Sequence, residues 1–228
     1  MLNLIENFKE KARKLNKTIV LPEGEEPRVI RAAEKITAEG FAKIIILGDE
    51  KVIREKCPDA KLDGVKIVNP KTSEKVGEYA KVLFELRKAK GMTEDEAERL
   101  IKDEMYYGVM MVKMGDADGL VSGACHSTAD TLRPALQILK TAPGTKLVSA
   151  FFVMCTDTPQ FGTDGTLIFA DCGLNINPSS DELSEIAIAS AHSWSTFMGS
   201  VEPHVAMLSY STICLLYTSP SPRDRSLS

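Results

Sequence analysis

Residues 18–47, TIVLPEGEEPRVIRAAEKITAEGFAKIIIL, decide the fold class. The stretch begins with a short β-type run, Thr18–Leu21, and ends with a second apolar run, Ala42–Leu47. Between them Pro27–Glu39 has apolar residues at helical spacing, and Gly40 follows at the position where helices commonly end. A strand, a helix and a second strand in this order predict an α/β unit with a mostly parallel sheet.

The same alternation of strands and helices continues beyond this unit and predicts a first α/β domain over residues 1–143. Residues 1–16 carry apolar positions at helical spacing among many charges, which predicts an amphipathic helix rather than a signal peptide. The other expected strands are 65–68 and 119–122, and the other expected helices are 73–90, 93–103 and 106–114.

A second α/β domain is predicted over residues 144–212, after the turn-forming segment Thr141–Gly144. Two β-type runs, Lys146–Thr156 and Thr166–Asp171, predict an antiparallel hairpin with its turn at the Asp-Gly pair between them. The remaining expected elements are a helix over about 177–197, capped by Asn177–Ser179, and a strand at Val205–Tyr210.

The charge and composition exclude several classes of protein. Lys and Arg total 28 against 32 Asp and Glu, so the formal charge of −4 indicates no binding surface for nucleic acid or an anionic membrane. No stretch approaches the roughly 18 apolar residues of a membrane span. The five cysteines form no close pair, which predicts neither a zinc site nor a disulfide framework and favours a reducing, cytoplasmic compartment.

The segment SGACHSTADTLRP, residues 122–134, directly follows an expected strand, where α/β sheets place their ligands. It offers three hydroxyl donors, an arginine fork suited to phosphate and the free N–H groups of a helix N-terminus, which together could hold an anion. The alternative is structural, because Ser127 and Asp130 also match a capping box and Asp130 would repel phosphate. The candidate binding residues are Ser127, Thr128, Thr131 and Arg133.

Arg87 is a further candidate, because it lies four residues after Leu83 on the apolar stripe of its expected helix. A cation on that face needs an anionic partner, although an arginine near a helix C-terminus can also lay its stem on apolar surface and keep its charge in water. His126 either orients a ligand or is a hydrogen-bonded loop residue, and Asp171 is either a general base or a turn residue. No histidines have metal-ligand spacing, so no metal is predicted.

Four longer strings carry a more specific signal: LPEGEEPR at 21–28, GACHSTADTLRPALQ at 123–137, FGTDGTLIFADCG at 161–173 and VAMLSYST at 205–212. In order and spacing they resemble the phosphate acetyl/butyryl transferase family. The resemblance extends almost continuously over residues 1–212 and is closer to the acetyl-specific members than to the butyryl branch. It implies a two-domain α/β fold similar to isocitrate dehydrogenases, a homodimer, and an active-site cleft between the domains.

The resemblance also implies a reaction, the transfer of an acetyl group between coenzyme A and inorganic phosphate through acetyl phosphate, with no cofactor beyond coenzyme A. A base takes the thiol proton, the thiolate attacks the acetyl carbonyl and phosphate leaves. In the family the base is an Asp and the main oxyanion donors are a Ser–Arg pair, all expected beyond Thr212. The substrate-binding residues implied here are Arg87 and Arg133 for phosphate groups, and Ser127, Thr128 and Thr131 as hydroxyl donors.

The sequence after Thr212 no longer resembles the family. Residues 213–228, ICLLYTSPSPRDRSLS, are rich in Ser, Pro and Arg and show no core periodicity. They resemble translated adapter read-through, and the alternative is a natural flexible tail. We therefore expect a C-terminally truncated chain with a non-native or disordered tail, inactive as written because its catalytic residues are missing.

Three other functions stay open at this point. The first is phosphate butyryltransferase, which performs the same chemistry on a longer acyl group. The second is a non-catalytic, regulatory domain of the same family. The third is a nucleotide-dependent dehydrogenase that shares the fold.

Overall fold

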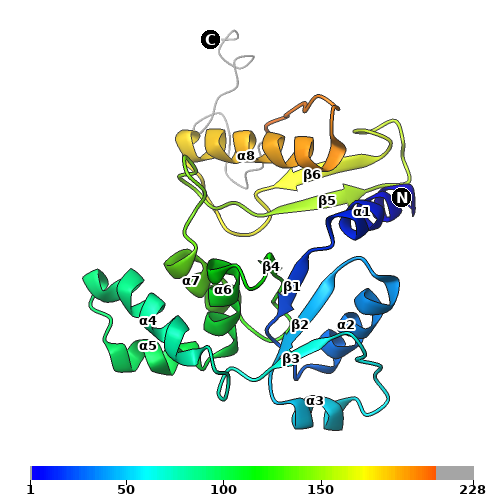
Figure 1. The fold of residues 1–228 in the computed structure, drawn as a ribbon. Coiled ribbons are helices and arrows are strands. Elements are labelled where there is room, and N and C mark those ends of the chain that lie inside the picture. The colour runs from blue at the N-terminus through cyan, green and yellow to red at the C-terminus, as the bar shows by residue number, and fades with distance from the viewer. Residues whose placement is uncertain (1, 209–228) are drawn as a thin grey trace. The chain divides into compact units, whose positions relative to one another are not determined.

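The computed structural model describes residues 2–208, which form two compact units (Figure 1). Each unit has its own sheet and its own helices. Unit 1 comprises the residues up to Lys146 together with Cys155–Gln160, and unit 2 comprises Leu147–Met154 and the residues from Phe161 onward.

A parallel sheet of four strands in the order β3-β2-β1-β4 forms the centre of unit 1. In its register Val20 of β1 pairs with Ile45 of β2 on one side and with Leu120 of β4 on the other. All four strands fall where the sequence pattern predicted them, which confirms the α/β class. Their bounds are β1 Thr18–Leu21, β2 Lys43–Leu47, β3 Lys66–Val68 and β4 Gly119–Leu120.

Helices cover both faces of this sheet because successive side chains of a strand point to opposite sides. Ile44 and Ile46 of β2 belong to one buried cluster, with residues of α2 and α3, while Ile45 and Leu47 belong to another, with residues of α4, α5, α6 and α7. The helices are α1 Leu2–Leu15, α2 Pro27–Glu39, α3 Glu50–Lys56, α4 Val76–Arg87, α5 Glu94–Ile101, α6 Glu104–Met114 and α7 Thr128–Ile138, with a 3₁₀ turn at Lys88–Lys90.

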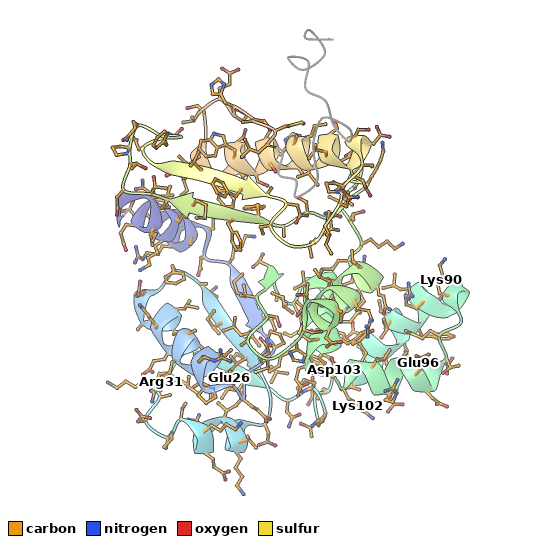
Figure 2. All side chains as sticks on the ribbon, turned by 180° about the vertical axis from the view of Figure 1, so that it is seen from behind. Glu26, Arg31, Lys90, Glu96, Lys102 and Asp103 are labelled. Atoms are coloured by element: carbon orange, nitrogen blue, oxygen red, sulfur yellow. The ribbon has the colours of Figure 1, made fainter. Side chains whose placement is uncertain are left out.

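The methionine-rich helix α6 lies directly against the sheet, at the place where the sequence predicted a helix over 106–114. Asp103 caps it by accepting hydrogen bonds from the N–H groups of Met105, at 3.0 Å, and Tyr106, at 3.2 Å (Figure 2). A methyl group on Gly108 would come 2.7 Å from Cδ1 of Leu120, so the glycine sets how closely α6 approaches β4. This packing fixes the position at which β4 ends and the following loop begins.

The turn after β1 packs equally closely against the end of β2. The N–H of Gly24 donates to the carbonyl oxygen of Leu47 at 3.1 Å. A Cβ atom at position 24 would lie 2.3 Å from that same oxygen, so only glycine fits there. The preceding residue, Glu23, is thereby held at the carboxyl edge of the sheet.

Unit 2 contains a two-stranded sheet of β5 Phe151–Cys155 and β6 Thr166–Ala170, and the helix α8 Ser180–Met198. The N–H of Cys172 donates to the carbonyl oxygen of Ala150 at 3.0 Å, which places the end of β6 beside the start of β5. This is the antiparallel hairpin expected from the sequence, although both strands are shorter. A full capping box between Ser179 and Glu182 begins α8.

The C-terminal part of the chain differs from one expectation and leaves others untested. The predicted strand at 205–210 is wrong over its described part, because residues 205–208 form no strand. An apolar run becomes a strand only beside a hydrogen-bonding neighbour, and β5 and β6 pair only with each other among the described residues. The expected tail at 213–228 lies outside the described residues, and the domain limits 1–143 and 144–212 stay predictions.

We predict that Gly24→Ala destabilises unit 1 by about 1–3 kcal/mol, because the new methyl group displaces either the turn or the end of β2. The measurement is the free energy of unfolding from urea denaturation followed by circular dichroism. Gly77→Ala is the matched control. Gly77 is exposed in α4 with no atom near its Cβ position, so alanine there should be neutral or stabilise by up to about 1 kcal/mol. Equal stabilities of the two variants would contradict the prediction.

Candidate anion-binding site

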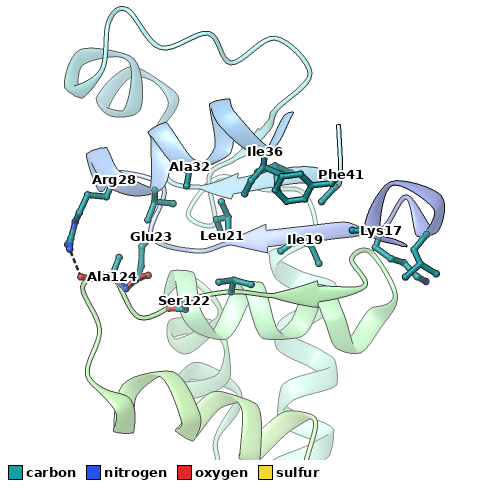
Figure 3. A pocket seen from close by; sticks show the side chains of 16 residues that line it. Lys17, Ile19, Leu21, Glu23, Arg28, Ala32, Ile36, Phe41, Ser122 and Ala124 are labelled. Carbon is teal, nitrogen blue, oxygen red and sulfur yellow. Dashed lines mark hydrogen bonds between the residues drawn. The ribbon is translucent and has the colours of Figure 1, made fainter. Parts of the chain in front are cut away.

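The turn after β1 and the loop after β4 meet at one edge of the sheet. The two strands are parallel neighbours, so their carboxyl ends lie side by side. The loop, residues 121–127, then leads into α7. Figure 3 shows Glu23 and Arg28 from the first segment beside Ser122 and Ala124 from the second. This edge is where parallel sheets commonly bind ligands.

The carboxylate of Glu23 holds the loop through five hydrogen bonds. Its Oε2 accepts from the backbone N–H groups of Gly123 and Ala124, both at 2.9 Å. Its Oε1 accepts from the N–H groups of Cys125, at 2.6 Å, and His126, at 2.9 Å, and lies 2.9 Å from Nδ1 of the His126 ring. Successive N–H groups that point into one concavity form a nest for an anion. In this chain the anion in the nest is a side chain of the protein.

Glu23 is buried, with 3 % of its side chain exposed, and nevertheless ionised. Burial by itself raises the pKa of Glu23, but the hydrogen bonds from the backbone of Cys125 and Ala124 and from His126 outweigh that effect. The resulting pKa is about 2, against an ordinary value of 4.5. Sequence reasoning missed this residue, although a glutamate directly after a strand, between proline and glycine, was the available signal.

Two neighbours of Glu23 also tie the turn to the loop. Arg28 donates from a terminal guanidinium nitrogen to the carbonyl oxygen of Ala124 at 2.9 Å (Figure 3). The same guanidinium is paired with Glu26 at 2.6 Å, and Glu26 also accepts a hydrogen bond from Sγ of Cys125 at 3.5 Å. The segment that follows β1 therefore holds the loop through Arg28 and Glu26 as well as through Glu23.

At the start of α7, Ser127 acts as the helix cap. Its Oγ accepts from the N–H of Asp130 at 3.2 Å and donates to the Asp130 carboxylate at 2.6 Å. Ser127 therefore caps the helix through its side chain, while the reciprocal bond of a capping box, from the Ser127 N–H to the Asp130 carboxylate, is not among the hydrogen bonds of the described residues. Binding of a ligand by Ser127 stays a prediction. Thr128 is the exposed first residue of the helix, which continues through Pro134 rather than beginning there.

The other three candidate residues lie where α4, α6 and α7 pack together. Nε of Arg87 and Oγ1 of Thr131 are both buried without a hydrogen-bond partner among the described residues. Arg133 is exposed and has only a long contact, 3.8 Å, with Asp130. Such unsatisfied buried polar atoms are rare in folded proteins, and each calls for an explanation.

Tyr106 of α6 is affected by the charges of both arginines. Burial raises the pKa of this tyrosine, while the positive charges of Arg133 and Arg87 both act to lower it. The Tyr106 hydroxyl donates to Gln137 of α7 at 2.9 Å. Helix α4, which ends at Arg87, also packs against α7, which carries Arg133. A shared phosphate-binding role of the two arginines stays a prediction.

A cavity of about 460 Å³ lies in unit 1 between α1, α2 and the strands, beside the Glu23 turn and the loop residues Ser122 and Ala124. Its walls are mainly apolar and include Leu15, Ile36, Phe41 and Val121 (Figure 3). Its charged lining residues are Lys17, Glu23 and Arg28. Arg87, Ser127, Thr128, Thr131 and Arg133 do not line it, so this cavity does not bring the candidate anion-binding groups together.

Asp171 has the hydrogen bonds of a turn residue. Asp171 accepts hydrogen bonds from the N–H groups of Gly173 and Leu174, at 2.7 and 2.8 Å, as expected for a turn residue.

Within residues 2–208 no three His, Cys, Asp or Glu side chains are grouped to hold a metal ion. In the same range, the helices are all too short or too polar to cross a membrane.

Comparison with known proteins gives one consistent result. The family model described as "Phosphate acetyl/butaryl transferase" matches residues 3–217. A phosphate acetyltransferase of Acetivibrio thermocellus is 54% identical over 211 residues, which cover 92% of this chain and 63% of that protein. One of Clostridium acetobutylicum is 49% identical over 214 residues, covering 93% and 64%. The chain thus spans just under two thirds of the length of these relatives.

A solved structure agrees with the sequence relatives. A phosphotransacetylase from Streptococcus pyogenes superposes with a TM-score of 0.84 at 39% identity, covering 98% of this chain and 65% of that one. The mixed α/β architecture with its parallel sheet is therefore that of the phosphotransacetylases.

We predict that the stability contributed by Glu23 is lost in acid. Its pKa is lowered on folding, so the contribution is fully present above pH 4.5 and falls as the pH drops towards 2. The pKa difference corresponds to at most about 3 kcal/mol. Urea unfolding at pH 7 should show Glu23→Gln less stable than the wild type, and the gap should narrow at pH 3. Glu55→Gln, an exposed control in α3, should differ little from the wild type at either pH. A gap that is independent of pH would contradict the prediction.

Proposed function

Because the chain belongs to the phosphate acetyl/butyryl transferase family, we propose that it contributes the phosphate-binding groups of an acetyltransferase acting between coenzyme A and inorganic phosphate. The observation that carries the proposal is the Nε of Arg87, which is buried and has no hydrogen-bond partner among the described residues, at the end of a helix that packs against α7, the helix of Thr131 and Arg133. The phosphate acetyltransferases at 49–54% identity support the acetyl rather than the butyryl reaction.

The two arginines suit the phosphate groups of the substrates. A guanidinium presents its N–H groups as a planar fork that matches two phosphate oxygens. Arg133 is exposed and available, with 59 % of its side chain in solvent. Arg87 has a buried N–H without a partner in the part of the chain that the structure describes, and an oxygen acceptor at that place would satisfy it.

The hydroxyl donors fit less directly. Thr131 has a buried hydroxyl with no hydrogen-bond partner within residues 2–208. Thr128 is exposed at the first turn of α7, where free N–H groups favour an anion. Ser127 already donates to Asp130, so it reaches a phosphate only if the ligand takes the place of that carboxylate. The positive charge of Arg133 offsets the repulsion between Asp130 and a bound phosphate.

In the proposed reaction a base removes the proton of the coenzyme A thiol, and the thiolate attacks the carbonyl carbon of acetyl phosphate. The bond from that carbon to the phosphate oxygen then breaks, which leaves acetyl-CoA and inorganic phosphate. The role of the described residues is to hold the phosphate groups and to stabilise the leaving phosphate by hydrogen bonds and charge. The base and the oxyanion donors are expected beyond Thr212, outside the described residues.

The remaining parts of the proposal concern the complete enzyme. We propose a homodimer in the cytoplasm that uses coenzyme A, acetyl phosphate and inorganic phosphate and no other cofactor. An acyl-chain length series would separate acetyl from butyryl specificity. A regulatory, non-catalytic role would show as ligand binding without turnover in the complete enzyme.

We predict that the chain binds coenzyme A and that Arg87→Gln and Arg133→Gln each weaken binding by about 10- to 100-fold, the loss expected when a charged hydrogen bond to phosphate is removed. Isothermal titration calorimetry measures the affinities. Arg54→Gln removes the same charge from an exposed ion pair on α3 and should leave binding unchanged. Unaltered affinity in both site variants would overturn the proposed role of the arginines.

A chimera tests the activity itself. Residues 3–208 of this chain would replace the matching part of the Acetivibrio thermocellus relative, and acetyl-CoA formation would be assayed. We predict activity within about tenfold of that relative, and a higher KM for coenzyme A when Arg133→Gln is added. A folded chimera, checked by its thermal melt, that has no activity would count against the proposed function.

A further inference from the structure

We propose that Glu23 is a positioning residue, whose carboxylate fixes both the backbone of the loop Gly123–His126 and the tautomer of the His126 ring. The groups at the start of α7 and the outer nitrogen of His126 are thereby presented to the substrate in a single arrangement. The effect of Glu23 on substrate binding rests on the proposed function. Its effect on the loop can be measured without any substrate.

The first step is that a side chain of the protein itself, Glu23, occupies the nest of backbone N–H groups. Four consecutive N–H groups, from Gly123 to His126, all donate to the two oxygens of Glu23. With 3 % of the Glu23 side chain exposed, a substrate phosphate has no access to these donors. The loop is therefore shaped by a built-in anion before any ligand arrives, and the substrate must bind to groups that follow it in the chain.

The second step concerns His126. An ionised carboxylate only accepts hydrogen bonds, so the ring nitrogen facing Glu23, Nδ1 at 2.9 Å, carries a hydrogen. In the neutral ring, Nε2 is then left with a free lone pair. The side chain is 28 % exposed, so the ring is partly accessible. A carboxylate that fixes the tautomer of a histidine in this way is a common device for setting which nitrogen meets a ligand.

The third step is that the loop has few other strong attachments. Beside Glu23, the described residues hold it by the contact from Arg28 to Ala124, a hydrogen bond from Cys125 to Glu26, one from Ser122 to the sulfur of Met105 and, at the start of the loop, the backbone bond from Val121 to Val20. Strand β4, which precedes the loop, is two residues long. Because Ser127 caps α7 immediately after the nest, a shift of the loop moves the first turn of that helix.

The variant Glu23→Gln tests the proposal with little change of volume. The carbonyl oxygen of the new glutamine can accept from two of the loop N–H groups. Its NH₂ group is a hydrogen-bond donor and cannot accept from the other two. We expect the four amides of residues 123–126 to exchange hydrogen at least about tenfold faster than in the wild type. We also expect ¹⁵N NMR of the imidazole to show His126 protonated at Nδ1 in the wild type and as mixed tautomers in the variant. Unchanged exchange and an unchanged tautomer would overturn the proposal.

Two further variants keep the result interpretable. Glu25→Gln removes a charge from the same turn. The Glu25 carboxylate accepts a hydrogen bond from the backbone N–H of Asp49 rather than from the loop, so the exchange rates of the loop amides should not change. Glu23→Ala empties the nest, so added formate should bind there and restore slow exchange. A loss of protection at residues 123–126 that is no larger than the loss across the rest of unit 1 in Glu23→Gln would refute a positioning role.

Coenzyme A titrations separate this inference from the proposed function. If the wild type binds and Glu23→Gln binds about tenfold more weakly, with the loop loosened, both hold. Binding that is unaffected by a loosened loop refutes the positioning role and leaves the proposed function standing. A wild type that does not bind coenzyme A refutes the proposed function, while the exchange and tautomer results still decide the effect of Glu23 on the loop.

Discussion

The site described here depends on one interaction, the burial of the Glu23 carboxylate among four backbone N–H groups and a histidine ring. A buried charge is costly unless hydrogen bonds compensate it, and here five do so. In return the carboxylate joins the turn after β1 to the loop after β4. The close packing of Gly24 on Leu47 and of Gly108 on Leu120 sets the two strands and α6 so that this contact can form.

Much of the fold could be predicted because its signals are local. The apolar runs of β1 and β2, the helical spacing between them and the Gly40 stop act over short windows of sequence, and the structure confirms each of them. The short helix α3 was not predicted, since its seven residues give too few turns for a clear period. The strand at 205–210 was overpredicted because pairing depends on a partner that periodicity cannot reveal.

The site was harder to predict than the fold, because it depends on contacts between distant residues. Ser127 matched both a cap and a ligand donor, and the geometry shows it capping α7 through Asp130. Arg87 was singled out as a cation on an apolar stripe, and its Nε is buried, but a bound phosphate there stays a prediction. Glu23 lies about 100 residues from the loop it holds, so no local pattern could link them.

The central claim is that the loop held by Glu23 leads into an anion-binding surface formed by Arg87 and the start of α7. Titration of coenzyme A into the ¹⁵N-labelled chain, followed by NMR, tests it most directly. The account predicts that signals of Arg87, Tyr106 and residues 127–133 shift together with one dissociation constant. Shifts confined to the apolar cavity around Ile36 and Phe41, with these signals unmoved, would contradict it.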